Sequence, residues 1–522
     1  MENDAKESGA AKTRHPGLER FNKRTGRGLA GALLLGALIF QAPWKVTLIA
    51  AFAFASSVGL IPNPIMNASK WIVRGALIAW PVWVFLPSDP GGYKPFTFVE
   101  EQAQFEEEYG VPADQNACAA YMRLLEESEP NDRHLPSWMG ESDKAVLRRP
   151  WSSQEHPEIA RWLDERESII EALKSLSQYS QCRFPTEPML PTSDSADERI
   201  EAVKAWAHVL AAAASRKAGE GDIAGALQIY ALISKIANHH IQQYDVRDYL
   251  VGLAVEKMVF DGITGMAVDG SPAPDELAIM DALVATPSHE WASTWRRIMS
   301  FGCLSVKNTF CRAVYEIDAK GRIRYSRSSY VDYQGIKSPY QRSFNGKRLA
   351  SGMWLVLPKS PWKFARCIDE RYEQFSQIGQ PGIDPEFQGT KHHSRFRANH
   401  EYVLDRLTDI LEPAYYKVHG IHTKSVAARQ ACRIILLLRQ YKDETGRWPE
   451  SLDEVAGKGD SKLWTDPLSG GPFVYKPEGQ AFRLYSGGKD GVDEDGTGGD
   501  DFSFWPTQRK KAERERASPE PE

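Results

Sequence analysis

The chain has 522 residues, 64 Lys and Arg against 69 Asp and Glu, a formal net charge of −5 and a mean hydropathy of −0.44. At about 150 residues per domain, this length allows roughly three to four domains. An apolar content of 42% excludes a mainly disordered protein. The near balance of charge gives no general basic surface, which excludes a dedicated nucleic-acid-binding protein.

Three apolar runs near the N-terminus predict membrane-spanning helices. They cover residues 28–42, 46–61 and 71–86, with breaks at Pro43 and Pro62. Proline removes a backbone donor and bends or ends a helix, so two hairpin turns are expected. Each run is shorter than the about 20 residues that span a bilayer, so the helices extend further or one run only dips into the membrane. A buried helical hairpin of a soluble domain is the alternative.

Charge predicts the orientation of these helices. Residues 1–27 form a basic cytoplasmic tail, whereas the stretch after Leu86 is acidic. Basic segments stay on the cytoplasmic side, so we expect a cytoplasmic N-terminus. Three spans within residues 28–87, or a single span, then place the rest of the chain outside, and two spans would keep it inside. We expect three spans, hence an integral membrane protein with a large extracytoplasmic part.

The six cysteines form no C-x-x-C pair, which excludes a zinc ribbon or a thioredoxin-type motif. Their even number permits disulfides if most of the chain lies outside the cytoplasm. Six cysteines allow many pairings, and the sequence does not choose among them. Small buried apolar side chains without any disulfide are the alternative.

The middle of the chain has the pattern of packed helices. Residues 88–196 are predicted as a helical segment with linkers, and residues 197–310 as a compact helical domain. Within that domain, Trp206 and Tyr230 lie on the apolar faces of two helices joined by a glycine-containing turn. Asp222 follows the turn and is expected to cap the second helix.

After residue 310 the periodicity of apolar residues changes twice. Residues 311–397 begin with two short alternating runs around a turn, which predicts a β-hairpin followed by an irregular segment. Helical periodicity returns at residues 398–411 and again at 425–441. The expected fold is therefore mainly α and membrane-anchored, with a β-hairpin insertion and a small α+β module at residues 398–505. Residues 506–522 are expected to form a disordered charged tail.

Three motifs follow the last predicted helix in a fixed order. They are GRWPESL at 446–452, DPLSGGPFVY at 466–475 and YSGGKDG at 485–491. This series resembles the C-terminal globular head of the major pseudopilin of type II secretion, over roughly residues 425–505. The resemblance implies a helix, a small antiparallel sheet and an acidic calcium-binding loop. The overall layout resembles uncharacterised bacterial membrane proteins that end in such a module, which implies the inner (cytoplasmic) membrane of the cell envelope.

The acidic loop after Tyr485 supplies the candidate metal ligands. A hard divalent cation takes six to eight oxygen ligands, and the glycines between the acids let the chain turn tightly. The resemblance places Asp490 at the first ligand position and Asp500 and Asp501 near the later ones. An EF-hand-like register instead uses Asp493 and Asp495 but lacks the final bidentate Glu. We therefore predict a Ca²⁺ site among the following five aspartates: Asp490, Asp493, Asp495, Asp500 and Asp501. A solvated acidic turn without an ion is the alternative.

No enzyme signature is present in linear form, and no catalytic or organic cofactor-binding residue is predicted. The histidine pairs His239-His240 and His392-His393, the latter followed by His400, are candidate metal ligands only if folding brings them together. Adjacent histidines of a helix point about 100° apart, so we expect structural or surface roles for them.

Two functions remain. The first is a membrane-anchored cell-envelope protein with a calcium-stabilised pseudopilin-like module that acts in contact with a protein partner or in assembly. The second is an envelope enzyme whose active site lies in the helical domain without a linear motif. The first is favoured because each recognisable feature serves anchoring, packing or ion binding.

Overall fold

The computed structural model describes a central and a C-terminal part of the chain. The described ranges are 99–185 apart from 130–131, 133–134 and 141–147, then 194–317 apart from 288, then 323–325, 361–379, and 399–506 apart from 458–459, 491 and 497. The predicted basic tail, the membrane region at 28–87, His392 and His393 lie outside these ranges. None of the helices within them is both long and apolar enough to cross a membrane.

The chain divides into two compact units. Their segments are, for the first unit, Met1–Phe98, Val306–Arg371 and Gln388–Leu411, and for the second, Val99–Ser305, Tyr372–Phe387 and Glu412–Glu522. The described part of the first unit contains strands β1 (Tyr315–Ile317) and β2 (Ile323–Tyr325). They pair antiparallel with Tyr315 opposite Tyr325, which confirms the predicted hairpin.

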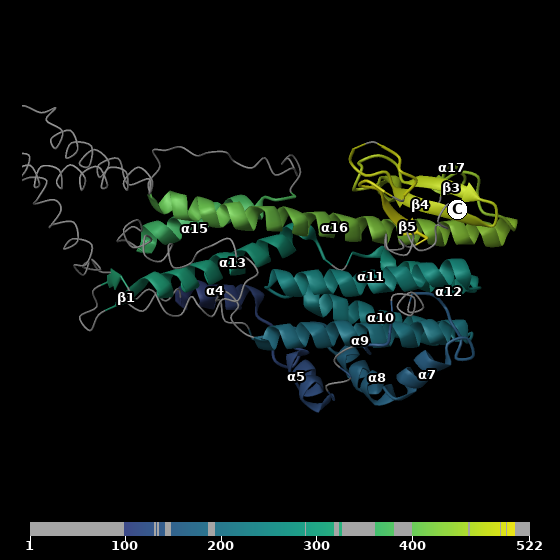
Figure 1. Cartoon of the computed structure of the whole chain (residues 1–522), viewed down its shortest axis with the longest axis horizontal. Helices are drawn as coiled ribbons and strands as arrows, with labels where there is room; N and C mark the ends of the chain where they lie inside the picture. The colour runs from purple at the N-terminus through teal and green to yellow at the C-terminus, as the bar shows by residue number, and fades with distance from the viewer. Residues whose placement is uncertain are drawn as a thin grey trace, which may run out of the picture. The chain divides into compact units, whose positions relative to one another are not determined.

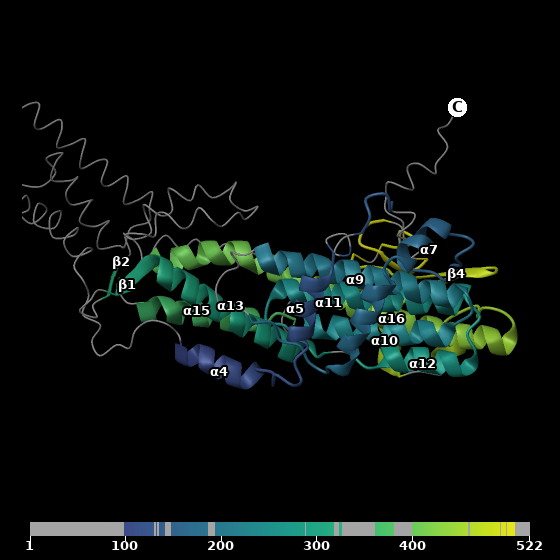
Figure 2. The same cartoon turned by 90° about the horizontal axis from the view of Figure 1, so that it is seen from below.

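The second unit is mainly helical. Its helices, with those that continue into the first unit, are α4 (Val99–Tyr109), α5 (Cys118–Glu127), α7 (Pro157–Asp164), α8 (Glu167–Lys174), the 3₁₀ turn η2 (Ser175–Gln178), α9 (Asp194–Gly219), α10 (Ile223–Ile241), α11 (Val246–Asp269), α12 (Pro274–Ala285), α13 (Trp291–Val314), α15 (Pro361–Ser376) and α16 (Asn399–Thr445). Helices α9, α10 and α11 pack against one another and lie side by side in both views (Figures 1 and 2). These three helices lie where the periodicity predicts helices, and the compact unit that contains them extends beyond the predicted domain at 197–310.

Helices α9 and α10 form the predicted hairpin. The Asp222 carboxylate accepts a hydrogen bond from the Gly225 N–H at 2.9 Å and so caps α10. Trp206 and Tyr230 are 1% and 0% exposed and belong to one core, which confirms their predicted burial. Gly262 of α11 lies against the Tyr230 ring, since a Cβ there would stand 2.1 Å from the tyrosine oxygen. The absence of a side chain at Gly262 lets α11 approach α10 closely.

Helix α16 differs from its prediction. The sequence predicts two helices, because helical periodicity is found at 398–411 and again at 425–441. The structure joins them in one helix of 47 residues. Tyr415 and Val418, three residues apart, are both buried and continue the helical face across the predicted gap.

The C-terminal module follows α16. It contains α17 (Asp453–Ala456), the 3₁₀ turn η6 (Ser461–Trp464) and the strands β3 (Val474–Glu478), β4 (Ala481–Ser486) and β5 (Phe502–Trp505). The strands form one antiparallel sheet in the order β3-β4-β5. Phe482 and Leu484 of the sheet join the same buried core as Ile434 and Leu438 of α16. A mainly helical fold with a small C-terminal antiparallel sheet is thus confirmed.

Candidate functional site

The loop between β4 and β5 gathers three carboxylates. Ligand oxygens of Asp490, Glu494 and Asp500 all lie within 4.8 Å of one another. Oxygen-only donors of full negative charge suit a hard divalent cation such as Ca²⁺, and they do not suit a softer metal that prefers nitrogen or sulfur. The chemistry of the donor set therefore fits the predicted ion, and two of the five predicted ligands, Asp490 and Asp500, are in the triad.

Backbone hydrogen bonds hold the loop in this shape. Asp500 Oδ2 accepts hydrogen bonds from the N–H groups of Lys489 and Asp490, the latter at 3.3 Å. Asp501 is 6% exposed, and its Oδ2 accepts from the N–H groups of Glu494 at 3.0 Å and Gly496 at 2.9 Å. The structure thus places the predicted ligand Asp501 at the inner side of the loop, where it fixes the backbone that carries Glu494.

Two glycines make room for the triad. Gly488 has φ +63°, and a Cβ there would stand 1.9 Å from Asp500 Oδ1. Gly499 has φ +57°, and its Cβ would stand 2.3 Å from Glu494 Oε1. Both positions combine a left-handed backbone with close approach of a carboxylate, so glycine is required at each.

Asp493 and Asp495, the other two predicted ligands, form ion pairs instead. Lys476 Nζ of β3 lies 2.8 Å from Asp493 Oδ2 and also contacts Asp495 Oδ1. Tyr485 donates its hydroxyl hydrogen to Asp493 Oδ1 at 2.7 Å. These hydrogen bonds, the one from Lys476 first, lower the pKa of Asp493 to about 2. The structure does not bring either side chain into the triad.

Glu494 completes the triad, but it is not among the five metal ligands predicted from the sequence. Neither the pseudopilin-like nor the EF-hand-like spacing of ligands assigns a ligand to position 494. Desolvation, followed by the charges of Asp490, Asp501 and Asp500, raises the pKa of Glu494. This is the direction expected where like charges are crowded, and a bound cation would reverse it.

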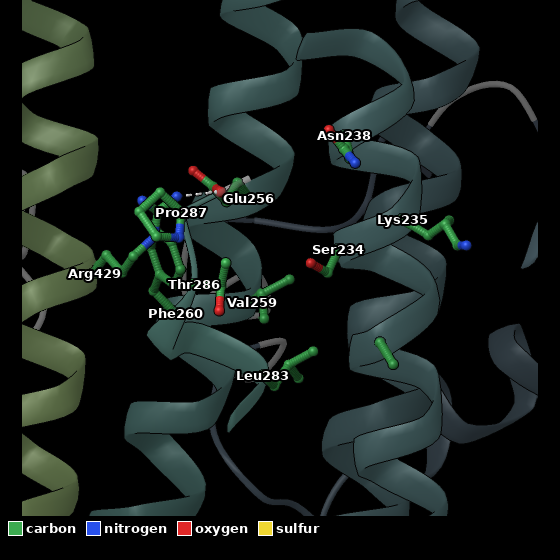
Figure 3. A pocket seen from close by; sticks show the side chains of 11 residues that line it. Ser234, Lys235, Asn238, Glu256, Val259, Phe260, Leu283, Thr286, Pro287 and Arg429 are labelled. Atoms are coloured by element: carbon green, nitrogen blue, oxygen red, sulfur yellow. Dashed lines mark hydrogen bonds and ion pairs between the residues drawn. The ribbon is translucent and has the colours of Figure 1, made fainter. Parts of the chain in front are cut away.

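A second feature is a cavity of about 380 Å³ in the helical domain. Its lining comes from α10, α11, the end and following turn of α12, and α16, namely Ala231, Ser234, Lys235, Asn238, Glu256, Val259, Phe260, Leu283, Thr286, Pro287 and Arg429. Figure 3 shows Glu256 joined to Arg429 on one side and Asn238 and Ser234 of α10 on the other. The Glu256 carboxylate accepts from Arg429 at 2.6 Å and from Ser425 Oγ at 3.1 Å. The lining contains neither paired carboxylates nor a histidine, the features of an acid–base site.

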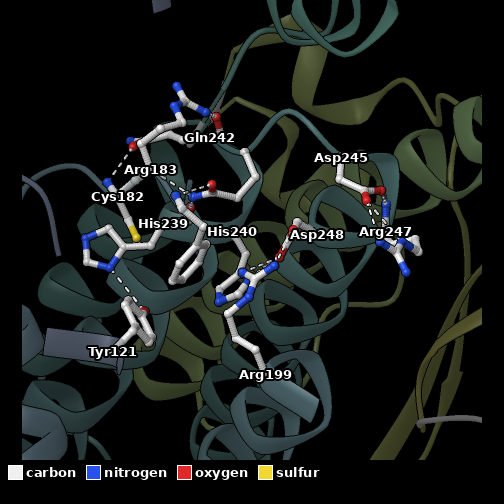
Figure 4. A network of polar contacts seen from close by, with 12 residues as sticks. Tyr121, Cys182, Arg183, Arg199, His239, His240, Gln242, Asp245, Arg247 and Asp248 are labelled. Atoms are coloured by element: carbon white, nitrogen blue, oxygen red, sulfur yellow. Dashed lines mark hydrogen bonds and ion pairs between the residues drawn. The ribbon is translucent and has the colours of Figure 1, made fainter. Parts of the chain in front are cut away.

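The adjacent histidines 239 and 240 belong to a buried polar network (Figure 4). His240 Nδ1 donates to Asp248 Oδ1 at 2.9 Å, and Arg199 binds both oxygens of that carboxylate at 2.9 and 2.8 Å. Burial raises the pKa of Asp248, but the hydrogen bond from His240 and the charge of Arg199 outweigh it and lower the pKa to about 2. His239 lies between the Tyr121 hydroxyl and a backbone carbonyl. These contacts tie α5, α9, α10 and α11 together, which is a structural role.

A third group of histidines comes from separate segments. The Tyr249 hydroxyl lies 3.0 Å from His289 Nε2 and 2.9 Å from His422 Nδ1. Burial lowers the pKa of His289 to about 4 and that of His422 to about 3, so both imidazoles are neutral at pH 7. Tyr249 has one hydroxyl hydrogen, so it donates to one imidazole and accepts from the other. His400 lies in α16, and the ligand set proposed from the sequence around it includes residues outside the described ranges.

Comparison of the chain with models of protein families, with curated proteins and with solved structures gives no match. The resemblance of residues 425–505 to a pseudopilin head therefore rests on the motifs and on the order of the elements. Function has to be inferred from the acidic loop, the cavity and the surfaces around them.

Proposed function

We propose that this chain is a membrane-anchored cell-envelope protein whose C-terminal module binds Ca²⁺ and acts in contact with a protein partner. The observation that carries the proposal is the convergence of Asp490, Glu494 and Asp500 within 4.8 Å in a loop that is braced from inside by Asp501. In an acidic turn without an ion, three carboxylates this close repel one another. A cation between them removes the repulsion.

The order of elements supports the resemblance to a pseudopilin head. Helix α16 is followed by the Asp466-Pro467 turn, then by β3 and β4, and the acidic loop opens directly after Ser486. The same succession of helix, turn, sheet and loop is implied by the resemblance. The acidic loop is the element that the family uses to bind calcium.

Calcium would be held by the carboxylates of Asp490, Glu494 and Asp500, with further oxygen ligands from water or backbone to reach six to eight. Its chemistry here is structural, since it neutralises the triad and orders the loop between β4 and β5. Val492 lies within that loop and is 54% exposed. Ordering of the loop presents this apolar side chain at a fixed position, which suits contact with a partner surface that has an apolar centre and basic surroundings.

The calcium site is tested by thermal unfolding of the full chain in detergent, with millimolar Ca²⁺ or with chelator. We expect a higher melting temperature in Ca²⁺, and loss of that response in Asp490→Asn and Asp500→Asn. Asp493→Asn should keep the response because its carboxylate binds Lys476, and Asp114→Asn is an exposed control far from the loop in sequence. An identical melting temperature of the parent chain in Ca²⁺ and in chelator would contradict the proposed calcium site.

Partner binding is tested separately by crosslinking and pull-down from detergent-solubilised membranes in Ca²⁺ and in chelator. A specific partner should be captured in Ca²⁺ by the parent chain and lost in Asp490→Asn. Val492→Asp should lose the partner while it keeps the calcium-dependent melting temperature. A partner captured equally well in chelator contradicts the role assigned to the loop.

The proposed location, in the inner membrane with the residues after about 88 outside, is supported by the basic tail at 1–27 and the acidic stretch after Leu86. Protease added to intact spheroplasts should digest the chain after about residue 88. Protection until the membrane is opened would favour two spans and a cytoplasmic location.

The alternative, an enzyme with its active site in the helical domain, is supported by the cavity beside Glu256. The polar groups of Ser234, Asn238 and Thr286 line a volume that suits a small polar molecule. Ser234→Phe should fill the cavity. A metabolite that raises the melting temperature of the parent chain but not of Ser234→Phe would favour this function.

A further inference from the structure

Two cysteines that are 64 positions apart in the sequence are brought together in the second unit. Cys118 is the first residue of α5, and Cys182 follows η2. We propose that Cys118 and Cys182 form a disulfide bond under oxidising conditions. The proposal is independent of calcium binding and concerns a covalent modification that joins the start of α5 to the segment before α9.

The backbones on either side of the two cysteines are paired. Asn116 and Gln181 form a parallel β-bridge, with the Ala117 N–H donating to the Gln181 carbonyl at 3.0 Å. The Asn116 side chain extends this pairing, because its Nδ2 donates to the Arg183 carbonyl at 3.0 Å. Asn116 and Ala117, directly before Cys118, thus lie beside residues 181–183.

One oxygen atom fixes the two cysteine positions relative to each other. Asn116 Oδ1 accepts hydrogen bonds from the Cys118 N–H at 3.0 Å and from the Arg183 N–H at 2.8 Å. Arg183 directly follows Cys182, so both cysteine backbones lie beside the same amide oxygen. A disulfide needs Cα atoms about 4.4–6.8 Å apart, and the shared contacts with Asn116 place the two cysteines in adjoining segments.

The segment that carries Cys182 is also held from its other side. Gln243 at the end of α10 donates to the Cys182 carbonyl at 2.7 Å and accepts from the Phe184 N–H at 3.1 Å. The position of Cys182 is therefore set independently of Cys118.

The side chains share one environment. Cys182 is 0% exposed in the core beside Tyr121, and Cys118 is half-buried against the same core, one helical turn before Tyr121. Burial raises the pKa of Cys182, and the charge of Cys118 raises it further. Of the four cysteines whose side chains the structure describes, Cys303 and Cys432 lie elsewhere, in α13 and α16.

The oxidation is a thiol–disulfide exchange with a low-molecular-weight disulfide such as oxidised glutathione. The Cys118 thiolate, the more exposed of the two, attacks one sulfur and releases one reduced thiol. The Cys182 thiolate then attacks the mixed disulfide at Cys118 and releases the second small thiol. In total, the two protein thiols lose two electrons and two protons, and two small thiols are formed. Burial raises the pKa of both cysteines, so the exchange is faster at alkaline pH.

The bond would close a loop that contains α7, α8 and η2. Such a crosslink stabilises a fold mainly because it reduces the freedom of the unfolded chain. Its persistence depends on an oxidising compartment, as expected for the extracytoplasmic location proposed above. Thiols whose pKa is raised do not stabilise the reduced form as thiolates, so this bond is expected to be structural rather than easily reduced.

The test uses the full chain in detergent, incubated at alkaline pH with oxidised and reduced glutathione. Free thiols are then blocked with N-ethylmaleimide, and the chain is digested without reduction for mass spectrometry. We expect a linked pair of peptides that contain Cys118 and Cys182. Alkylation of both cysteines, glutathione attached to Cys118 alone, or a link from either one to another cysteine would overturn the proposal.

Three variants complete the experiment. Cys118→Ser and Cys182→Ser should each abolish the linked peptide, whereas Cys432→Ser, another buried cysteine of the core, should retain it. Dithiothreitol should lower the melting temperature of the oxidised parent chain and leave Cys118→Ser unchanged. If Cys182→Ser does not fold, the half-buried Cys118→Ser still decides the result. An equal effect of dithiothreitol on the parent and on Cys118→Ser contradicts the stabilising role.

Discussion

Ser486 donates a hydrogen bond to Asp466 Oδ2 at 2.5 Å, which joins the turn before β3 to the end of β4. Asp466 is 0% exposed, and its carboxylate also accepts from the N–H groups of Leu468 and Ser469 and from the Ser469 hydroxyl. Two of the three motifs of the C-terminal module thus meet at one buried carboxylate. The acidic loop begins directly after Ser486, so this contact sets where the loop starts.

Replacement of Asp466 should loosen the module. Asp466→Ala leaves two backbone N–H groups and two hydroxyls without their acceptor, at a cost of about 1–3 kcal/mol for each buried group that stays unsatisfied. We expect a lower melting temperature and faster amide exchange in residues 486–501. Ser486→Ala removes one hydrogen bond and should have a smaller effect. Exchange in the loop that equals that of the parent chain would show that the contact does not hold it.

Glu494→Gln should change stability in opposite directions with and without calcium. The pKa of Glu494 is raised, so its ionised form is disfavoured in the folded chain, and stability is lost as pH rises from the ordinary value of 4.5 through the raised pKa of the folded state. Removal of the charge should therefore raise the melting temperature in chelator at pH 7. The same substitution should weaken the response to Ca²⁺. Glu126→Gln, on the exposed side of α5, should do neither.

Lys476 should control the titration of Asp493. The depressed pKa of Asp493, about 2 against 3.8, contributes stability above pH 3.8 that is lost as pH falls towards 2. Lys476→Met removes the first cause of this shift and should return the pKa towards its ordinary value. NMR titration of the aspartate carboxyl carbons measures this change. High salt should reduce it in the parent chain, because the pair is exposed to solvent.

Two helix glycines should respond oppositely to alanine. Gly262→Ala places a methyl group against the Tyr230 ring and should destabilise the chain by about 1–3 kcal/mol, the usual cost of overpacking. A Cβ at Gly420 of α16 would meet no neighbouring atom within 4 Å, so Gly420→Ala should stabilise its helix by roughly 0.5–1 kcal/mol. Chemical denaturation of the two variants and of the parent chain measures both changes in the free energy of unfolding. A stable Gly262→Ala would show that α11 can move away from α10.

Much of the local structure of the described part follows from the sequence alone, although the gap predicted within α16 is helical. The helical hairpin with its Asp222 cap, the strand pair β1-β2, and the order of turn, strand and acidic loop all depend on residues within a few positions of one another. Hydrogen bonds between residues a few positions apart, and the face of a helix or strand on which a side chain lies, depend only on spacing along the sequence. For the same reason Trp206 and Tyr230 could be assigned to the core, since each lies on the apolar face of its own helix.

Which groups from distant parts of the sequence meet depends on the tertiary structure. Glu494 rather than Asp493 joins Asp490 and Asp500, because Lys476 of another strand takes Asp493 and Asp501 turns the backbone at Glu494. Cys118 and Cys182 become neighbours through a β-bridge between segments that α5, α7, α8 and the 3₁₀ turn η2 separate in the sequence. These contacts depend on the path of the whole chain. No periodicity encodes that path, so spacing along the sequence could name the candidate acids and cysteines but not choose among them.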